Sequence, residues 1–379
     1  MDNKNGVRVF SAPGRVEVCG NHTDHQHGRV LAAAINLEAT ATAAPNGTNS
    51  VRIRYDGFGA DEIDLLDLER KDAQSGTPSS IVRGVAAWFA NNGHAIGGFD
   101  AEISSEIPIG SGLSSSAAIE VLIANVFKGL FGAEISEIDI ARAGQYAENV
   151  YSWKPCGLMD QTASSYGGFN VIDFCDPAAP AVKPVFAEFC GYELCVVDTG
   201  GSHADLTSDY AACANEMKLV AKHFGKGYLR DVAEDDFYSS LPSLRYLGDR
   251  AVLRAIHYFE DDKRVQKQAD ALNNSDMRTF LDLVIESGRS SLAYLQNVYC
   301  PGSPQEQGLT LALAMSEKIL LGSGAWRVHG GGFAGTILAF VPDAMRDDYQ
   351  KQMTCVFGEG SCHFLMINKN GGRELDQQI

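Results

Sequence analysis

Alternating apolar and polar residues predict short strands in the first half of the chain. The alternation is clearest in Val51–Tyr55 and Phe99–Ile107, where every second side chain would face a core. Runs of β-branched and small residues predict further strands at Val7–Phe10, Val30–Asn36, Ala39–Ala44, Asn170–Phe174 and Leu194–Val197. We expect Pro13-Gly14 to end the first of these, and a charged residue to separate the second from the third.

Helical periodicity becomes more frequent toward the C-terminus. The predicted helices are Ile81–Ala90, Ala117–Leu130, Ile138–Tyr151, Ser208–His223, Ala251–Ala271, Met277–Leu295 and Gln305–Leu320. Between Trp326 and Val341 a glycine cluster separates two apolar runs, which predicts two strands joined by a turn, and Phe364–Ile367 is expected to be the final strand. Strands that are mostly non-adjacent and helices that come in groups favour an α+β fold.

The stretch Asp176–Pro184 is rich in proline and alanine and is the best candidate for a domain boundary. We therefore expect an N-terminal unit over residues 1–180 and a C-terminal unit over residues 181–379. A chain of 379 residues is long enough for two or three domains of ordinary size.

Composition and charge narrow the functional classes. Apolar residues make up 45% of the chain and charged residues 21%, which is typical of a globular protein. The formal net charge of −17 argues against nucleic acid and against anionic membranes as partners. The nine cysteines form no C-x-x-C pair, and the N-terminus has no signal-peptide pattern. We therefore expect a reduced, cytoplasmic protein without membrane spans.

A glycine- and serine-rich segment follows the strand predicted at Phe99–Ile107 and precedes a predicted helix. The unpaired N–H groups of a first helical turn, the helix dipole and nearby hydroxyls together favour phosphate binding. The candidate phosphate-binding residues are Gly110, Ser111, Gly112, Leu113, Ser114, Ser115, Ser116 and Ala117. The alternative is a plain loop with a serine N-cap, but three successive serines favour the functional interpretation. The segment is not a Walker A loop, because the chain lacks G-x-x-x-x-G-K-[ST].

A second polar segment, Gly14–Gly28, concentrates three of the nine histidines of the chain. The candidate ligand-contacting residues in it are Arg15, Asn21, His22, Asp24, His25 and His27. Such groups suit a polyhydroxyl ligand or a metal ion. No helix or strand face gathers three of the candidate ligands, which argues against a metal. The alternative is a solvated polar turn.

A third candidate is Asp160, which is the only charged residue between Lys154 and Asp173. A carboxylate without a local charge partner is either a working group or the N-cap of a helix that begins near Gln161. Upstream, Glu148 is either a metal ligand or a surface charge. The fourth motif, Gly330–Gly335, fits G-x-G-x-x-G, but a strand-like run follows it, which favours a ligand-approaching turn over a dinucleotide site.

Together these four segments resemble the GHMP kinase superfamily and, within it, the galactokinases. Gly14–Gly28 is similar to the galactokinase signature G-R-x-N-L-I-G-E-H-T-D-Y, and Pro108–Ala118 matches the superfamily phosphate loop P-x-G-x-G-L-S-S-S-A-A. Cys156–Gln161 resembles C-G-I-M-D-Q, and Gly330–Gly335 resembles G-A-G-F-G-G. The motifs occur in the family's order, so the resemblance spans essentially the whole chain.

The resemblance implies a two-lobed fold of mixed sheets and helices, with ATP and a sugar meeting in the cleft between the lobes. The activity implied is ATP-dependent phosphorylation of the C1 hydroxyl of a galactose-type sugar. Asp160 would accept or hold the hydroxyl proton, and Arg15 beside it would stabilise charge. Positions that match Mg²⁺ ligands are Ser116 and Glu148, and those that match sugar contacts are His22, Asp24, Gly157 and Tyr210. We expect a monomer or a weak homodimer.

Two departures from the family pattern bear on the substrate. Asn21 occupies the place of the signature Glu, which in the family accepts a hydrogen bond from the sugar 6-hydroxyl. Asparagine can still bind a hydroxyl, but it would also tolerate a C6 carboxylate, which a glutamate repels by several kcal/mol at about 4 Å. Galacturonate is therefore an alternative substrate, and N-acetylgalactosamine is another. Ser202 stands where galactokinases commonly have Arg, which removes one positive charge.

A non-catalytic sugar- and ATP-binding regulator is the alternative from a different functional class. Regulators of this fold tend to have a damaged phosphate loop, whereas Ser115, Ser116 and Ala117 are all present here. Asp160 and Arg15 are present as well. The sequence therefore favours the kinase.

Overall fold

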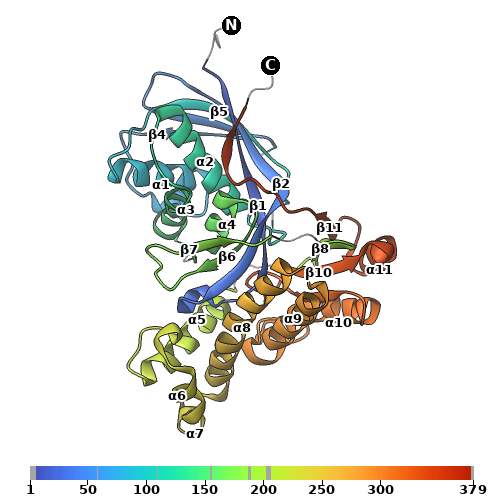
Figure 1. Cartoon of the computed structure of the whole chain (residues 1–379). Helices are drawn as coiled ribbons and strands as arrows, with labels where there is room; N and C mark the ends of the chain where they lie inside the picture. The colour runs from blue at the N-terminus through green and yellow to red at the C-terminus, as the bar shows by residue number, and fades with distance from the viewer. Residues whose placement is uncertain are drawn as a thin grey trace.

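The computed structural model describes residues 6–57, 59–108, 110–153, 156–186, 189–201 and 206–376, and it contains two sheets with their covering helices (Figure 1). This arrangement confirms the α+β prediction. The departure at Ser202 lies outside the described residues.

The larger sheet has eight strands in the order β12-β1-β2-β5-β3-β4, and β6 pairs with both β2 and β7. Its strands are β1 (Arg8–Cys19), β2 (Arg29–Pro45), β3 (Ser50–Tyr55), β4 (Gly59–Asp64), β5 (Phe99–Ser105), β6 (Phe169–Asp173), β7 (Ala181–Pro184) and β12 (Arg373–Leu375). β3 and β5 run parallel, and the other pairs are antiparallel. The predicted strands at 51–55, 99–107 and 170–174 are confirmed within a few residues.

The two longest strands correct the sequence prediction. We expected Pro13-Gly14 to end the first strand, but β1 continues to Cys19 through a register shift between Pro13 and Arg15. A β-bulge accommodates proline, which has no N–H to donate, without ending the strand. The strands predicted at 30–36 and 39–44 are likewise one strand, because β2 pairs with β1 on both sides of this shift.

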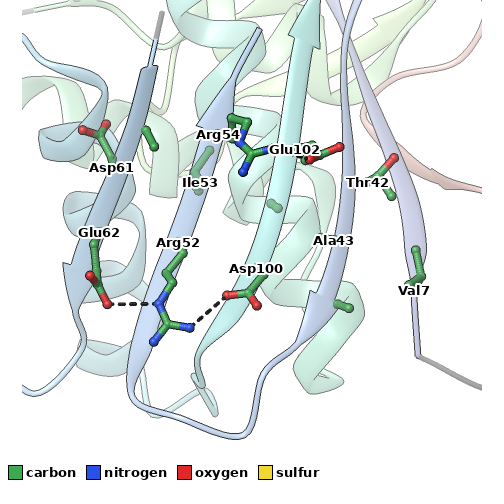
Figure 2. A pocket seen from close by; sticks show the side chains of 13 residues that line it. Val7, Thr42, Ala43, Arg52, Ile53, Arg54, Asp61, Glu62, Asp100 and Glu102 are labelled. Carbon is green, nitrogen blue, oxygen red and sulfur yellow. Dashed lines mark hydrogen bonds and ion pairs between the residues drawn. The ribbon is translucent and has the colours of Figure 1, made fainter.

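One face of the larger sheet is covered by helices, and the opposite face is exposed to solvent over β3, β4 and β5. Figure 1 shows α1 (Pro78–Asn91), α2 (Ser115–Phe131), α3 (Glu137–Tyr146) and α4 (Met159–Tyr166) gathered on one side of it. On the opposite face Figure 2 shows a shallow polar depression in which Arg52 bridges Glu62 and Asp100. Exposed cross-strand pairs of this kind keep the face soluble and contribute little stability.

The smaller sheet has the order β11-β8-β10-β9 and is buried on both faces. Its strands are β8 (Tyr192–Asp198), β9 (Ala325–Val328), β10 (Thr336–Pro342) and β11 (Cys362–Leu365). Successive residues of β8 face different cores: Leu194 and Val196 join the core of the larger sheet, whereas Cys195 and Val197 join a separate cluster. The strand at 194–197 and the strand–turn–strand at 326–341 are confirmed.

The remaining helices follow β8 in the chain, and several of them pack on the two sheets. They are α5 (Thr207–His223), α6 (Glu234–Ser239), α7 (Leu241–Leu244), α8 (Asp249–Asn273), α9 (Met277–Ser290), α10 (Gly308–Leu320) and α11 (Arg346–Phe357). α8 contacts β1, β2 and β6, and α9 contacts both β1 and β9. These two helices therefore join the halves of the molecule.

Two helices that the periodicity predicts as continuous change their geometry near the C-terminal end. Both α3 and α9 end in a π-helical turn, formed by Ala147–Tyr151 and Ser291–Leu295 respectively. A π turn inserts one extra residue, so the side chains beyond it are rotated relative to a regular helix. The first turn contributes Glu148 to the candidate site described below, and the second contributes Ser291, whose hydroxyl donates to Asn21.

The C-terminal segment returns to the first strand, which the sequence did not predict. We expected a final strand at 364–367, but β11 ends at Leu365 and β12 follows it, antiparallel to β1. The sequence pattern also did not predict β4, β7, α6, α7 and α11. Because β7 and β12 both belong to the larger sheet, this sheet takes strands from both sides of residue 180. The division into 1–180 and 181–379 stays a prediction.

No helix among the described ranges is long and apolar enough to cross a membrane.

The path to β12 generates a stability prediction. A methyl group at Gly371 would overlap the carbonyl of Ser165, whereas one at Gly227 would have no heavy atom within 4 Å. We expect Gly371→Ala to lower the free energy of unfolding by about 1–3 kcal/mol, because the backbone must shift. Urea unfolding curves measure this, with Gly227→Ala as the matched control. Equal stability of the two variants would contradict the close docking of this segment.

Candidate active site

The glycine- and serine-rich segment docks against the bulge of β1. The Arg15 N–H donates to the carbonyl of Leu113 at 3.1 Å, and Arg15 Nη1 donates to the carbonyl of Gly112 at 2.5 Å. A Cβ atom at Gly14 would lie 2.8 Å from the Leu113 carbonyl oxygen, so glycine is required for this approach. The register shift in β1 is thus the place where the loop is attached.

The same segment leaves the N-terminus of α2 without a side-chain cap. Ser114 precedes the helix in the left-handed conformation, with φ 58° and ψ 52°, and its hydroxyl donates to Asp160. The Ser114 side chain therefore does not occupy the first N–H groups of α2, which an anion-binding helix terminus needs for its ligand. On the other side of the loop, a Cβ atom at Gly110 would meet no heavy atom within 4 Å. The cap alternative of the sequence analysis is not what the structure shows.

Asp160 and Arg15 form a bidentate ion pair. Arg15 Nε donates to Oδ1 at 2.9 Å, and Nη2 donates to Oδ2 at 2.8 Å. The Arg15 side chain is 7% exposed, whereas that of Asp160 is 32% exposed, so the carboxylate is the partner that solvent or a ligand can reach. Asp160 lies in the first turn of α4, whose N-cap is Leu158, and so it is not the cap itself.

The polar segment after β1 is held by α8 and is not a solvated turn. Asp261 has no exposed surface and accepts from the N–H groups of Gly20, at 3.0 Å, and Asn21, at 3.1 Å. The His257 ring contacts the Asn21 carbonyl through Nε2 at 2.9 Å. These contacts fix the backbone from which the predicted ligand contacts project.

The turn between β9 and β10 meets this segment from the other half of the molecule. His22 Nε2 lies 2.9 Å from the carbonyl of Gly331, and the Tyr210 hydroxyl donates to the carbonyl of Gly332 at 3.0 Å. Side chains at either glycine would overlap Tyr210 or Asn297. The fourth motif therefore has glycines because three other segments pack directly on its backbone.

Asp24 and Gly157 are adjacent, although 132 residues of chain separate them. A Cβ atom at Gly157 would overlap Asp24 Oδ2, so a residue with any side chain would displace the carboxylate. Asp24 is fixed by its own turn, where Oδ1 accepts from the His25 N–H at 2.9 Å. Because Asp160 follows Gly157 closely, the contact between Asp24 and Gly157 brings the predicted sugar contacts near the predicted catalytic carboxylate.

Glu148 is buried and is therefore not a surface charge. It lies in the π turn after α3 with 5% exposure, and Gln161 Nε2 donates to it at 3.2 Å. The same Nε2 donates to Glu120 at 2.8 Å. Ser116 precedes Glu120 by one turn of α2 and shares its face of the helix. A hydroxyl and a buried carboxylate facing one region are suitable oxygen ligands for a divalent cation. Within the described ranges, no three His, Cys, Asp or Glu side chains form a ready-made metal site.

Three buried residues lie at the junction where the segment after β1 meets the turn between β9 and β10, and the sequence pattern did not indicate them. Glu17 accepts from Asn21 Nδ2 at 2.9 Å and from Arg327 Nη2 at 3.2 Å, and Asn297 Nδ2 donates to Asn21 Oδ1 at 2.7 Å. Burial raises the pKa of Glu17 to about 7, against the opposing effects of Arg327 and Arg15. Glu17 occupies the position at which the galactokinase signature has Asn. This mismatch is the sequence feature that could have identified Glu17.

Three histidines at the junction are neutral. Burial lowers the pKa of His22 to about 3, and it also lowers those of His257 and His329. His329 Nε2 accepts from the Glu17 N–H at 3.1 Å, which requires an unprotonated nitrogen. A protonated ring here would place a third positive charge near Arg15 and Arg327.

Comparisons with known proteins agree with this geometry. The family model described as the GHMP kinases N terminal domain matches residues 80–168, and the galactokinase galactose-binding signature matches residues 2–45. The chain is 30% identical to a galactokinase of Glaesserella parasuis, over 90% of this chain and 89% of the relative. It is also 30% identical to a galactokinase of Streptomyces coelicolor, over 97% of this chain and 94% of the relative.

Solved structures give the same result. Lactococcus lactis galactokinase in complex with galactose superimposes with a TM-score of 0.85 at 25% identity, over 97% of this chain and 95% of that one. A mevalonate kinase superimposes with a TM-score of 0.67 at 16% identity, over 95% of this chain and 99% of that one, which shows the shared fold.

The neutral histidines generate a pH prediction. We expect the rings of His22, His257 and His329 to stay unprotonated in the folded protein at pH values where unfolded histidines, which titrate near pH ~6.5, already take up a proton. The unfolded chain therefore binds more protons at these sites, and their contribution to stability falls as pH drops through ~6.5. ¹H–¹⁵N NMR of histidine-labelled protein measures this, with the urea-unfolded chain as control. A folded-state titration at or above the pH at which the unfolded chain titrates would, at any of the three, contradict the assignment.

Proposed function

The chain belongs to the galactokinase family, and on this premise we propose that it transfers the γ-phosphoryl group of ATP to the anomeric hydroxyl of a galactose-type sugar. The observation that carries the proposal is the bidentate pair of Arg15 and Asp160, which lies directly beside the uncapped N-terminus of α2. An anion-binding terminus next to a partly exposed carboxylate is what transfer of a phosphoryl group to a hydroxyl requires.

The segment from Gly110 to Ala117 is the proposed ATP phosphate site. Its support is the open side at Gly110 and the N-terminus of α2, which has no side-chain cap. Arg15, which donates to the Gly112 carbonyl, lies between this loop and Asp160. It can therefore stabilise the charge on the transferring phosphoryl group while it orients the carboxylate.

Asp160 is the proposed catalytic residue. The sugar oxygen O1 attacks the γ-phosphorus, a new O1–P bond forms, and the bond from phosphorus to the β–γ bridging oxygen breaks to release ADP. The O1 proton passes to Asp160 or is held by it during transfer. Ser114 and Arg15 both bind this carboxylate, so its position is set before the sugar arrives.

His22, Asp24, Gly157 and Tyr210 are the proposed sugar site. The proposal is supported by the adjacency of Asp24 and Gly157, which closely precedes Asp160, and by the contacts of His22 and Tyr210 with one glycine turn. A carboxylate and an imidazole that bind neighbouring hydroxyls discriminate sugars by their stereochemistry.

Mg²⁺ is the proposed metal, with Ser116 and Glu148 as its protein ligands. When bound, it would neutralise charge on the ATP phosphates. The residues present suit it: a hydroxyl and a carboxylate are hard oxygen ligands, and Glu148 is buried close to Glu120, where a cation would offset two negative charges.

Galacturonate is a second candidate substrate, because Asn21 is neutral where the family signature has Glu. The surroundings of Asn21 weaken the case for galacturonate. Asn21 has no exposed surface, and the carboxylate of Glu17 lies one hydrogen bond behind it. The negative charge is therefore displaced and not absent, which favours galactose. A non-catalytic regulator is less favoured, since Asp160, Arg15 and the phosphate loop are mutually assembled.

A substrate panel tests the proposed function. ADP release is measured with ATP and Mg²⁺ over galactose, galacturonate, N-acetylgalactosamine, glucose and arabinose. We expect kcat/KM for galactose to exceed that for every other sugar by at least about tenfold, or roughly 1.4 kcal/mol of transition-state preference. A higher value for galacturonate would select the second candidate. Absence of sugar-dependent turnover would overturn the kinase assignment in favour of the regulator.

Asp160 is tested by an isosteric change. We expect Asp160→Asn to lower kcat by about 10²–10⁴-fold, because the amide can neither accept the proton nor carry the charge. The matched control is Asp347→Asn, since the Asp347 side chain is 95% exposed. Steady-state ADP release and thermal unfolding are measured for both variants. Turnover by Asp160→Asn within about twofold of wild type would rule out the proposed role.

A further inference from the structure

Two positions of the galactokinase signature are exchanged in this chain. The signature G-R-x-N-L-I-G-E-H-T-D-Y has Asn and then Glu at the positions that Glu17 and Asn21 occupy here. The two side chains are in direct contact, because Asn21 Nδ2 donates to Glu17 Oε1 at 2.9 Å. One carboxylate and one amide are therefore retained at the pair, but their places are reversed.

Asn21 uses its full hydrogen-bonding capacity. Its Nδ2 donates to Glu17 and, at 2.6 Å, to the carbonyl of Gly330. Its Oδ1 accepts from Asn297 Nδ2 at 2.7 Å and from the Ser291 hydroxyl at 3.3 Å. Two donors and two acceptors are all that an amide offers. A glutamate at position 21 could not donate to the Gly330 carbonyl and would place a second carboxylate against Glu17.

Glu17 is tied to a buried cation. Arg327 has no exposed surface, and besides Glu17 it binds the backbone carbonyls of Val18 and Val328. Removal of the Glu17 charge would leave this guanidinium without its ion-pair partner in a low-dielectric region, which is strongly unfavourable. The carboxylate at position 17 is therefore required by Arg327, just as the amide at position 21 is required by Gly330.

The pair fixes the turn on which the proposed sugar contacts rest. Gly330 is followed by Gly331 and Gly332, whose carbonyls bind His22 and Tyr210. A shift of the Gly330 carbonyl therefore moves the backbone partners of both side chains. Asn21 itself has no exposed surface, so its effect on a ligand passes through this turn.

We infer that Glu17 is a positioning residue for the sugar site and that it acts with Asn21 as one coupled pair, in which a carboxylate at position 17 requires an amide at position 21. This inference rests on the proposed function for its kinetic readout. It differs from the sequence expectation, in which Asn21 by itself is a sugar ligand.

The surroundings of Glu17 also give the pair a pH dependence. The charged groups that face Glu17 are Arg327 from β9, Arg15 from its own strand and Asp24 from the following turn, and the neutral ring of His329 binds its N–H. Because burial raises the pKa of Glu17 to about 7, it loses its charge as pH falls below that value. The hydrogen bond from Asn21 and the ion pair with Arg327 then weaken. KM for the sugar therefore increases as the pH is lowered from about 8 to about 6.

The test is a double-mutant cycle of Glu17→Asn, Asn21→Glu and the double variant, which restores the signature order. Each single variant should raise KM for the sugar at least about tenfold, with KM for ATP within about twofold of wild type. The rise in sugar KM of the double variant should be at least about tenfold smaller than the product of the two single-variant rises, which corresponds to about 1.4 kcal/mol of coupling. Glu62→Asn, on the exposed face of the larger sheet, is the control for Glu17→Asn (Figure 2).

Two outcomes would overturn the inference. The first is sugar KM effects that multiply independently. The second is lower thermal stability of the single variants with unchanged sugar KM, which is what a purely structural role gives. If the wild-type chain phosphorylates no sugar, the proposed function fails by itself. The cycle is then measured on thermal unfolding, where additive changes overturn the coupled pair.

Glu17→Gln keeps the inference testable if the cycle variants do not fold. Glutamine can still accept from Asn21 but carries no charge for Arg327. We expect its sugar KM to be raised several-fold at about pH 8 and to change little between pH ~6 and ~8, while the wild-type KM rises as pH falls. A wild-type KM that does not depend on pH, or an equal pH dependence in Glu17→Gln, would refute the role of Glu17.

Discussion

The ion pair of Arg15 and Asp160 depends on the register shift in β1. Before the shift, β1 is an ordinary strand of the larger sheet, and after it the strand carries Arg15 and Glu17 on one face. The shift lets the Leu113 carbonyl reach the Arg15 N–H, which attaches the phosphate loop where the guanidinium binds Asp160. A single irregularity in the backbone therefore brings Arg15 together with segments that are 97 and 145 positions away in the chain.

Charge burial explains why the junction of the two halves is so fully paired. A charge removed from water is tolerated only when a partner and hydrogen bonds replace its hydration. Asp261 is satisfied by the N–H groups of Gly20 and Asn21, and Arg327 by Glu17 and backbone carbonyls. These interactions fix the positions of the neighbouring groups within hydrogen-bond tolerance. The proposed catalytic and sugar-contacting residues are thereby positioned by buried residues that are not proposed to contact the ligand.

The sequence predicted what is locally encoded. The glycine-rich segments, the isolated carboxylate Asp160 and most strands and helices follow from residue patterns within about ten positions. The sequence could not predict where a regular pattern is interrupted by tertiary packing. Ala147–Tyr151 has ordinary helical periodicity, and its π turn becomes apparent only when Glu148 faces Gln161. The partnership of Glu17 with Arg327, 310 positions away, has no local signal at all.

The antiparallel pairing of β12 with β1 has a consequence for biosynthesis. β1 is synthesised well before β12, so the strand that carries Arg15 lacks one of its neighbours until the residues of β12 have been made. During that interval the outer edge of β1 exposes unpaired N–H and C=O groups, which can pair with other chains. Closure of the sheet is also a contact of very long sequence separation and is intrinsically slow. The larger sheet is therefore completed only after β12 has emerged from the ribosome, and until then β1 is the edge that a chaperone would need to shield.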